Sequence, residues 1–286
     1  MEQPDFMIKY KALIKGLDSD SIATIDKILF RIKESNQYKA GRYLDIFSAE
    51  EKKELLDLEN NLNRQIIKVA ADVYAWRDYF LPVNEFQPCV FYHHHGIKLL
   101  DREKIKNRDI VDVGGYIGDS ALVLSRYTDK KVYTFEGMGA NFAKLQKTIE
   151  LNSLTNVVPV QLALGAEKQT GFMDLKGSGS VVTSGQGNGE IVQIMPLDDY
   201  VTANDVDVGL IKVDIEGFEQ EFIKGAEQTI KLHKPALLLS IYHNMSDFFE
   251  IKPLLESWNL GYTFKVFRGT DGGIHRETML VAEVVD

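Results

Sequence analysis

The ten residues VDVGGYIGDS, positions 111–120, join an apolar run to three glycines and an acidic side chain. A strand that ends in glycines before a helix is typical of nucleotide sites, because glycine permits a tight turn and the helix start offers free N–H groups. The dinucleotide pattern G-x-G-x-x-G is not met, since Tyr116 occupies the third position from Gly114. Asp119 at the helix start would repel a pyrophosphate but not a cationic cofactor without phosphate. The alternative is that the glycines only make a tight turn.

A second acidic residue stands where a ribose would be bound. Glu136 ends the apolar run VYTFE about two dozen residues after Asp112. An acid at the tip of the second strand of such a fold accepts hydrogen bonds from both ribose hydroxyls. Together with the glycine turn, Glu136 predicts an adenosine-containing ligand. The sulfonium of S-adenosylmethionine suits an acidic pocket better than NAD does.

The stretch IKVDIEGFEQ, residues 211–220, supplies further carboxylates. It places Asp214 and Glu216 at the end of another apolar run, with Gly217 before a helix. In an open α/β sheet, ligands bind beyond the carboxyl ends of the strands, where the strand order reverses. We therefore expect Asp214 to face the same site. Glu216 has an alternative role, because an acid at this position also favours a helix N-terminus.

His243 and Asn244 follow the next apolar run, and several roles remain open for them. For transfer to a hydroxyl, His243 is the candidate general base, since an ordinary imidazole pKa of about 6.5 suits neutral pH. Asp214 would orient its ring, and Glu216 completes the predicted catalytic set. Alternatively, Asp214, His243 and Asn244 bind a divalent metal ion that lowers the pKa of the hydroxyl. A histidine that only satisfies its hydrogen bonds at a strand end is the third interpretation.

A parallel sheet with crossover helices would bring these strand tips together. From Asp109 onward, short apolar runs alternate with amphipathic stretches, as such a sheet requires. The expected strands are 109–113, 131–135, 157–162, 208–214, 235–242, 261–267 and 278–284. A β-like insertion interrupts the alternation at about 164–195. The α/β domain is expected to span residues 86–286.

From about residue 18 to 75, the sequence has helical rather than strand periodicity. Ser48 and Glu51 read as a capping box that opens a helix, and its apolar face is predicted to continue through Ile66 and Val69. We expect residues 1–85 to form a small helical region that covers the site or joins copies of the chain in a homo-oligomer.

Composition excludes several classes of function. The formal net charge of −9 over 286 residues disfavours a nucleic-acid partner, which would require a basic surface. Cys89 is the only cysteine, so an internal disulfide and a CxxC motif are ruled out. The chain has neither a secretory signal pattern nor an apolar run long enough to span a membrane, and we expect it in the cytoplasm without a membrane partner.

The same residues resemble the FkbM-type methyltransferase family over roughly residues 90–284. The matching stretches are DIVDVGGYIGDSALVLS, VYTFEGMGANFAKLQKTI, PLDDY, GLIKVDIEGFEQEFIKGA, KPALLLSIYHN and ETMLVAEV. The positions that match the family's functional residues are Asp112, Gly114 and Gly118 in the cofactor loop, Glu136 for the ribose, and the signature carboxylates Asp214 and Glu216. One departure is Ser240, where many members have a glutamate, so His243 would supply the polar function of that strand.

The resemblance implies a class I Rossmann-like methyltransferase with a mostly parallel seven-stranded sheet whose last strand is antiparallel. It implies methylation of a hydroxyl by S-adenosylmethionine on a sugar, a sugar nucleotide or a glycosylated metabolite. The SIYH form resembles a branch associated with surface-polysaccharide gene products. The expected cofactor-binding residues are Asp112, Gly114, Gly115, Tyr116, Gly118, Asp119, Ser120, Glu136, Gly137, Asn141, Leu162, Ala163 and Asp214. The alternatives are a non-catalytic module that binds an adenosine ligand and an NAD-dependent oxidoreductase.

Overall fold

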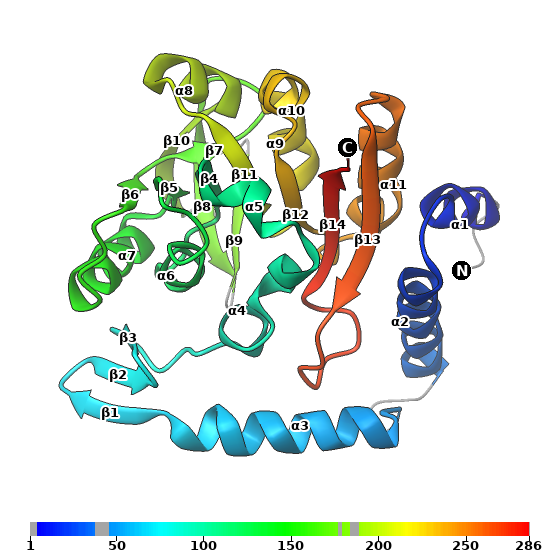
Figure 1. Ribbon diagram of the computed structural model, residues 1–286, viewed down its shortest axis with the longest axis horizontal. Helices are drawn as coiled ribbons and strands as arrows, with labels where there is room; N and C mark the ends of the chain where they lie inside the picture. The colour runs from blue at the N-terminus through cyan, green and yellow to red at the C-terminus, as the bar shows by residue number, and fades with distance from the viewer. Residues whose placement is uncertain (1–4, 38–45, 177–178, 184–188, 286) are drawn as a thin grey trace.

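The computed structural model describes residues 5–37, 46–176, 179–183 and 189–285. A seven-stranded sheet lies at its centre, with the order β13-β14-β12-β11-β4-β5-β6 (Figure 1). Its strands are β4 (Asp109–Val113), β5 (Val132–Phe135), β6 (Val157–Val160), β11 (Val208–Val213), β12 (Ala236–Ser240), β13 (Tyr262–Arg268) and β14 (Thr278–Val284). Strand β14 runs antiparallel to the other six strands, which are parallel to one another. The predicted class I Rossmann-like fold is confirmed.

Helices cover both faces of this sheet. They are α5 (Arg102–Lys106), α6 (Asp119–Leu124), α7 (Gly139–Leu151), α8 (Leu197–Asn204), α9 (Glu219–Gly225), α10 (Glu227–His233) and α11 (Met245–Ser257). Successive side chains of a strand point to opposite faces, so Ile110 enters one apolar core and Val111 enters another. Every residue of β11 is buried, as expected for a parallel strand covered on both sides.

The N-terminal helices pack on the sheet domain rather than around a core of their own. Helices α1 (Phe6–Ile14) and α2 (Ser19–Gln37) lie beside α11 and β13 (Figure 1). Leu13, Ile25 and Ile28 belong to the same apolar core as β4 and β11. These helices are therefore part of one folded unit with the sheet, because their apolar faces are buried against it.

The second half of the N-terminal region was predicted to be helical, but only its first part is. Helix α3 (Ala49–Asn61) begins with the predicted capping box of Ser48 and Glu51, but it ends before Ile66. A short 3-10 turn, η1 (Asn63–Gln65), leads to a three-stranded antiparallel sheet of β1 (Ile67–Ala70), β2 (Val73–Trp76) and β3 (Tyr79–Leu81). The β-branched residues Ile66, Ile67 and Val69 favour extended backbone, and this local preference outweighs the helical spacing.

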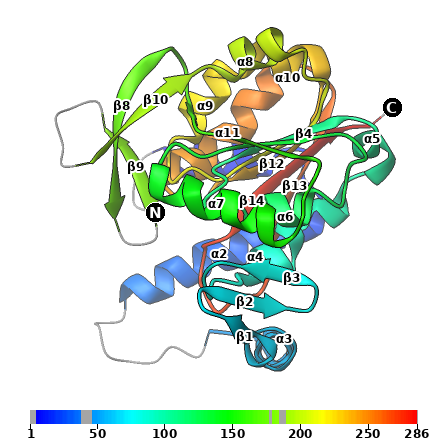
Figure 2. The same cartoon turned by 90° about the vertical axis from the view of Figure 1, so that its left-hand side faces the viewer.

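Two further segments complete the described chain. Helix α4 (Pro88–Phe91) and the 3-10 segment η2 (His94–Leu99) connect the small sheet to α5. The predicted insertion forms a second sheet, with the order β7-β10-β8-β9, that stands apart from the main one (Figure 2). Its strands are β7 (Ala163–Leu164), β8 (Gln169–Lys176), β9 (Gly179–Thr183) and β10 (Glu190–Met195). Within the described ranges, no helix has the length and apolar character needed to span a bilayer.

Candidate active site

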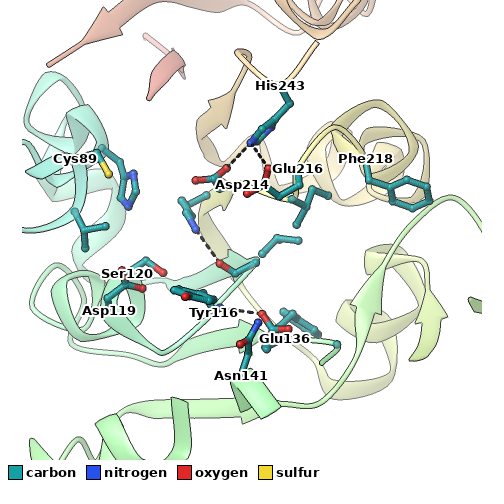
Figure 3. A pocket seen from close by; sticks show the side chains of 18 of the residues that line it. Cys89, Tyr116, Asp119, Ser120, Glu136, Asn141, Asp214, Glu216, Phe218 and His243 are labelled. Carbon is teal, nitrogen blue, oxygen red and sulfur yellow. Dashed lines mark hydrogen bonds and ion pairs between the residues drawn. The ribbon is translucent and has the colours of Figure 1, made fainter. Parts of the chain in front are cut away.

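A cavity of about 450 Å³ lies at the carboxyl ends of β4, β5, β11 and β12. This volume is within the usual range for a small-molecule site. Figure 3 shows Glu136 and Asn141 on one side of the cavity and Asp214, Glu216 and His243 on another. The ten expected cofactor residues that line it are Gly114, Tyr116, Asp119, Ser120, Glu136, Gly137, Asn141, Leu162, Ala163 and Asp214. The predicted catalytic residues Asp214, Glu216 and His243 line the same cavity.

The glycines after β4 are required by close packing. Gly114 has φ +81°, and a Cβ atom there would lie 1.9 Å from the backbone oxygen of Asp214. A Cβ atom on Gly115 would lie 2.3 Å from Oγ1 of Thr134. Gly118, with φ +84°, packs against α7. Gly115 and Gly118 do not line the cavity, so for these two glycines the structure supports the tight-turn alternative rather than cofactor contact.

Asp112 also departs from its expected role, because it lies beneath the cofactor loop and does not line the cavity. Its side chain is fully buried, and Oδ2 accepts hydrogen bonds from Ser120 and Thr134 at 2.8 and 2.9 Å. Oδ1 lies 3.2 Å from Nζ of Lys212. These partners hold the carboxylate inside the protein. Asp112 thus positions the loop and the start of α6 rather than contacting a ligand.

Lys212 is a functional residue that the sequence reasoning missed. It is a buried cation in the centre of the sheet, and its Nζ donates to the backbone oxygen of Gly114 at 3.1 Å as well as pairing with Asp112. Burial opposes its charge, but Asp112, Asp214 and Asp119 outweigh burial and raise the pKa of Lys212. A single lysine within an apolar strand run was the available signal.

Glu136 is held ready to accept from a ligand. Its Oε2 accepts the backbone N–H of Tyr116 at 2.9 Å, and its Oε1 accepts that of Met138 at 2.8 Å. Burial raises the pKa of Glu136 to about 7, although these N–H groups and Lys212 favour the charged form. A carboxylate oxygen has a second lone pair, so each oxygen can still accept one ribose hydroxyl. This geometry fits the predicted ribose role.

Asp119 is the first residue of α6 and is buried in the same cavity. Burial raises the pKa of Asp119 to about 7, while the charge of Lys212 opposes this shift. A carboxyl group with this pKa becomes fully charged when a cation binds beside it. Asp119 and Glu136 therefore make the cofactor side of the cavity suitable for a cationic ligand.

His243 lies among three carboxylates. Its Nε2 is 3.2 Å from Asp214 and 3.6 Å from Glu216 (Figure 3). Its Nδ1 is 2.8 Å from Glu219. Burial disfavours the imidazolium, but Asp214 and Glu219 outweigh burial and raise the pKa of His243 to about 10. The ring is therefore protonated at neutral pH. The argument for a general base rested on an ordinary imidazole pKa, and that argument does not hold for His243.

Glu219, rather than Asn244, is the third potential metal ligand of this cluster. Asp214, Glu219 and His243 each offer one atom, and these atoms lie within 4.8 Å of one another. Asn244 instead caps α11, where its side-chain oxygen accepts the N–H of Asp247 at 2.8 Å. Asn244 is consequently engaged in starting a helix. From the sequence, an acid at the position of Glu219 predicts only a favourable helix start, because its burial cannot be read from the sequence.

Polar groups from other segments complete the wall beside Asp214. The Tyr242 hydroxyl lies 3.2 Å from Asp214 Oδ1 and 3.4 Å from Glu277 Oε1. Burial and the charge of Asp214 raise the pKa of Glu277 to about 7. Cys89 is buried and lines the cavity, as does His95. This wall has donors and acceptors suited to a polyhydroxylated molecule.

Comparisons with known proteins agree with this geometry. The model of the Methyltransferase FkbM domain matches residues 112–264. Methyltransferase 1 of Beauveria bassiana (strain ARSEF 2860) is 27% identical over 174 residues, covering 52% of this chain and 70% of that protein. The crystal structure of methyltransferase FkbM from Methylobacillus flagellatus KT is similar with a TM-score of 0.64 at 18% identity, and the similarity covers 96% of this chain and 58% of that one. This chain thus spans 58% of the length of that relative.

The family match extends over more than half of the 286 residues and includes the glycine loop, Glu136 and the Asp214 strand tip. The chain therefore belongs to the methyltransferase FkbM domain family.

Proposed function

We propose that this methyltransferase transfers the methyl group of S-adenosylmethionine to a hydroxyl of a sugar, a sugar nucleotide or a glycosylated metabolite. The observation that carries the proposal is the convergence of Glu136, Asp119 and Asp214 on one cavity beside a second wall of hydroxyl, carboxyl and imidazole groups. The acidic side suits a sulfonium and a ribose. The opposite wall suits an acceptor with several hydroxyls.

The chain's own residues would bind and orient the two reactants. Glu136 accepts from the ribose, while Asp119 and Asp214 supply negative charge near the cationic sulfur. The bound cofactor supplies an activated methyl group. Tyr242 and Glu277 would orient the acceptor, and such alignment contributes strongly to a displacement reaction. Synthesis of a surface polysaccharide is a context in which such a product would be used.

The cluster of Asp214, Glu219 and His243 supports a second occupant, a divalent metal ion. The buried Glu219 Oε2 has no hydrogen-bond partner in the described part of the chain, and neither ring nitrogen of His243 makes a hydrogen bond of good geometry there. An ion with one nitrogen and two oxygen ligands would satisfy these atoms, and it would lower the pKa of an acceptor hydroxyl. It would first have to displace the His243 proton, so binding should strengthen as pH rises.

A screen of sugars and sugar nucleotides, followed by release of S-adenosylhomocysteine with and without chelator, tests these proposals. We expect turnover with a hydroxyl-bearing acceptor. Loss of turnover in chelator, restored by Mg²⁺ or Mn²⁺, would support the metal, and full turnover in chelator would exclude it. Calorimetry should show binding of S-adenosylmethionine and not of NAD. Methylation of only nitrogen or carbon acceptors would contradict the proposed chemistry.

The proposed partners follow from the same cavity. We propose a small carbohydrate acceptor and no nucleic-acid partner, in keeping with the net charge of −9. A homo-oligomer formed through the N-terminal helices stays a prediction, and size-exclusion chromatography with light scattering would test it.

A further inference from the structure

A second pocket, of about 730 Å³, lies beside the cavity, where the segment that links β3 to α4 forms much of the wall (Figure 1). Its polar side chains, apart from Tyr116, are Asn63, Asn84, Glu85 and Gln87. We call this pocket the linker groove. Gln87 and Tyr116 line both the groove and the cavity, so the two spaces meet at these two side chains.

The linker groove presents carboxamide groups that are able to bind a ligand. Asn63, Asn84 and Gln87 are exposed, and the Asn84 side chain has no hydrogen-bond partner in the described part of the chain. Asn63 donates from Nδ2 to Glu59 at 3.0 Å, which leaves its oxygen for a ligand. The Gln87 oxygen accepts from the Cys89 thiol at 3.6 Å, which leaves its NH₂ group. Carboxamides and hydroxyls both donate and accept, so these side chains are suited to neighbouring hydroxyls of a sugar ring.

The charge of the linker groove selects against anions. Glu85 is its charged residue, and none of the described residues that line it is lysine, arginine or histidine. The Glu85 carboxylate accepts from the Tyr116 hydroxyl at 2.7 Å. A diphosphate is bound most strongly by arginine and lysine, and here it would meet a carboxylate instead. Ile66 and Pro88 add apolar surface for the C–H face of a sugar ring. A neutral sugar unit therefore fits the groove better than the nucleotide part of a sugar nucleotide does.

The cavity itself has little room beyond the reacting groups. Its volume of about 450 Å³ lies in the lower part of the range of about 300–1,000 Å³ for a site that holds one small molecule. It must take the cofactor and the hydroxyl that is methylated, so further units of an acceptor must lie outside it. Cys89 marks a path, because its thiol lies beside Glu277 in the cavity wall and contacts Gln87 at the groove.

We propose that the linker groove binds the sugar unit next to the one that is methylated, an inference that rests on the proposed methylation of a sugar hydroxyl. The methylated unit lies in the cavity beside Tyr242 and Glu277. The neighbouring unit lies outside it, against Asn63 and Asn84. The acceptor is therefore a neutral chain of two or more sugar units rather than a free monosaccharide or a sugar nucleotide.

The first test compares acceptors of different length. Release of S-adenosylhomocysteine is measured with monosaccharides, with their disaccharides and trisaccharides, with UDP-glucose and with phenyl glucoside. The sugars are glucose, galactose, mannose, N-acetylglucosamine and rhamnose. We expect kcat/KM for the best disaccharide or trisaccharide to exceed that of its monosaccharide roughly tenfold or more, because two or more neutral hydrogen bonds of about 2- to 12-fold each are added. UDP-glucose and phenyl glucoside should gain less, since one places an anion in the groove and the other an apolar ring.

Three variants locate this gain. Asn63→Ala and Asn84→Ala each remove one carboxamide from the groove. Asn60→Ala is the matched control, because Asn60 is an exposed amide of α3 that accepts from Arg64 at 3.4 Å and lines neither pocket. Each variant is compared with the wild type in kcat/KM, in the Kd for S-adenosylhomocysteine and in the midpoint of thermal unfolding.

We expect Asn84→Ala to lower the ratio of kcat/KM between trisaccharide and monosaccharide by roughly 2- to 12-fold, the effect of one neutral hydrogen bond. The double variant with Asn63→Ala should lower the ratio by roughly 5- to 100-fold. Asn60→Ala should keep the wild-type ratio. The unfolding midpoint and the Kd for S-adenosylhomocysteine, within about twofold, should stay at wild-type values in all variants, because these side chains are exposed and lie outside the cavity.

A second measurement does not require turnover. The side-chain amide signals of Asn63 and Asn84 are identified in the NMR spectrum by their loss in the alanine variants. They are then followed in protein saturated with S-adenosylhomocysteine as each sugar of the panel is added. A disaccharide or trisaccharide that binds should shift both signals and leave that of Asn60 unchanged, whereas UDP-glucose should shift neither.

The two measurements separate failure of this proposal from failure of the proposed function. Wild-type protein that methylates no sugar, but whose Asn84 signal shifts with a trisaccharide, would refute the proposed function and support the groove. Amide signals that no oligosaccharide shifts would refute the groove, whatever the turnover. Equal kcat/KM for a monosaccharide and its longer chains would also refute it, as would a higher value for UDP-glucose or phenyl glucoside. A Kd for S-adenosylhomocysteine raised several-fold in Asn84→Ala would assign the groove to the cofactor.

Discussion

Replacement of Glu136 by glutamine tests the cofactor side of the cavity most directly. Glu136 accepts one backbone N–H on each oxygen and is predicted to accept one ribose hydroxyl on each as well. Glutamine keeps the size of the side chain but has no charge and only one oxygen. Its amide group would face the N–H of either Tyr116 or Met138, and that donor would lose its acceptor.

The expected losses of cofactor affinity and of folding free energy in Glu136→Gln follow from these contacts. A hydrogen bond to a charged group contributes about 1.5–3 kcal/mol and a neutral one about 0.5–1.5 kcal/mol. Loss of charge assistance at two ribose hydroxyls therefore costs about 2–3 kcal/mol, which is roughly a 30- to 150-fold increase in Kd. The unpaired backbone donor costs about 1–3 kcal/mol of folding free energy, and this loss should be visible in the unfolding midpoint.

Calorimetry with S-adenosylmethionine at several pH values is the assay. The pKa of Glu136 in the free protein is about 7, and ribose hydroxyls favour the carboxylate, so its pKa falls on binding. Affinity should accordingly be full above pH 7 and should weaken as pH falls, by roughly tenfold between pH 8 and pH 6 for one such group. The Glu136→Gln variant should show a flatter profile, with any remaining slope due to Asp119, whose pKa is also about 7.

Glu190→Gln is the control, because Glu190 also accepts a backbone N–H, that of Gly139 at 2.8 Å, but does not line the cavity. Its Kd should equal that of the wild type. A Glu136→Gln variant that is folded and binds the cofactor within threefold of the wild type would refute the ribose role.

Three other changes have distinct expected outcomes. Lys212→Met should lower the free energy of unfolding in urea by about 3–5 kcal/mol, because it leaves Asp112 buried and unpaired. Adding Asp112→Asn should restore part of that loss, and a further loss instead would argue against the ion pair. Gly114→Ala should abolish calorimetric binding of the cofactor in the protein that remains folded, and retained affinity would show that the loop can adjust. Glu219→Gln should move the pKa of His243 down from about 10 in an NMR titration. An unchanged pKa would mean that Asp214 alone sets it.

Local pattern was enough to predict the main sheet. All seven strands lie within two residues of the expected ranges, since each is a short apolar run bounded by polar or glycine residues. The glycine turn and Glu136 were also readable, because a tight turn and a strand tip are features of consecutive residues. The error near Ile66 and Val69 came from relying on one local signal, their helical spacing. Their β-branched side chains favour extended backbone, and the pairing of neighbouring β1 residues with β2 adds to that preference in a way that one segment alone does not reveal.

The missed residues depend on contacts between distant segments. Lys212 and Asp112 face each other only because β11 and β4 pair in the register that aligns these two positions. That register is set by packing over the whole sheet. His95 reaches the cavity through a left-handed turn held by Phe267, far along the chain. Residue type and spacing therefore identified the acids at the strand tips. The protonation states of the surrounding groups depend on neighbours from distant segments, which only the folded structure shows.

Those neighbours determine which carboxylates can attract the cofactor. Lys212 neutralises Asp112, and His243 shares its charge with Asp214 and Glu219. The cavity is therefore less negative than its acids suggest. On the proposed cofactor side, Asp119 and Glu136, whose pKa values are about 7, remain to respond to a cation.

The charge states of Asp119 and Glu136 also affect the proposed reaction cycle. A positive ligand draws both of these carboxyl groups into their charged forms, and this coupling strengthens binding of the sulfonium. Methyl transfer removes the charge from sulfur, so the same groups have less to attract in the neutral product. The proposed ribose bonds to Glu136 would persist in both states, whereas the charge attraction would be present only before transfer. On this proposal, the arrangement favours exchange of the spent product for fresh cofactor.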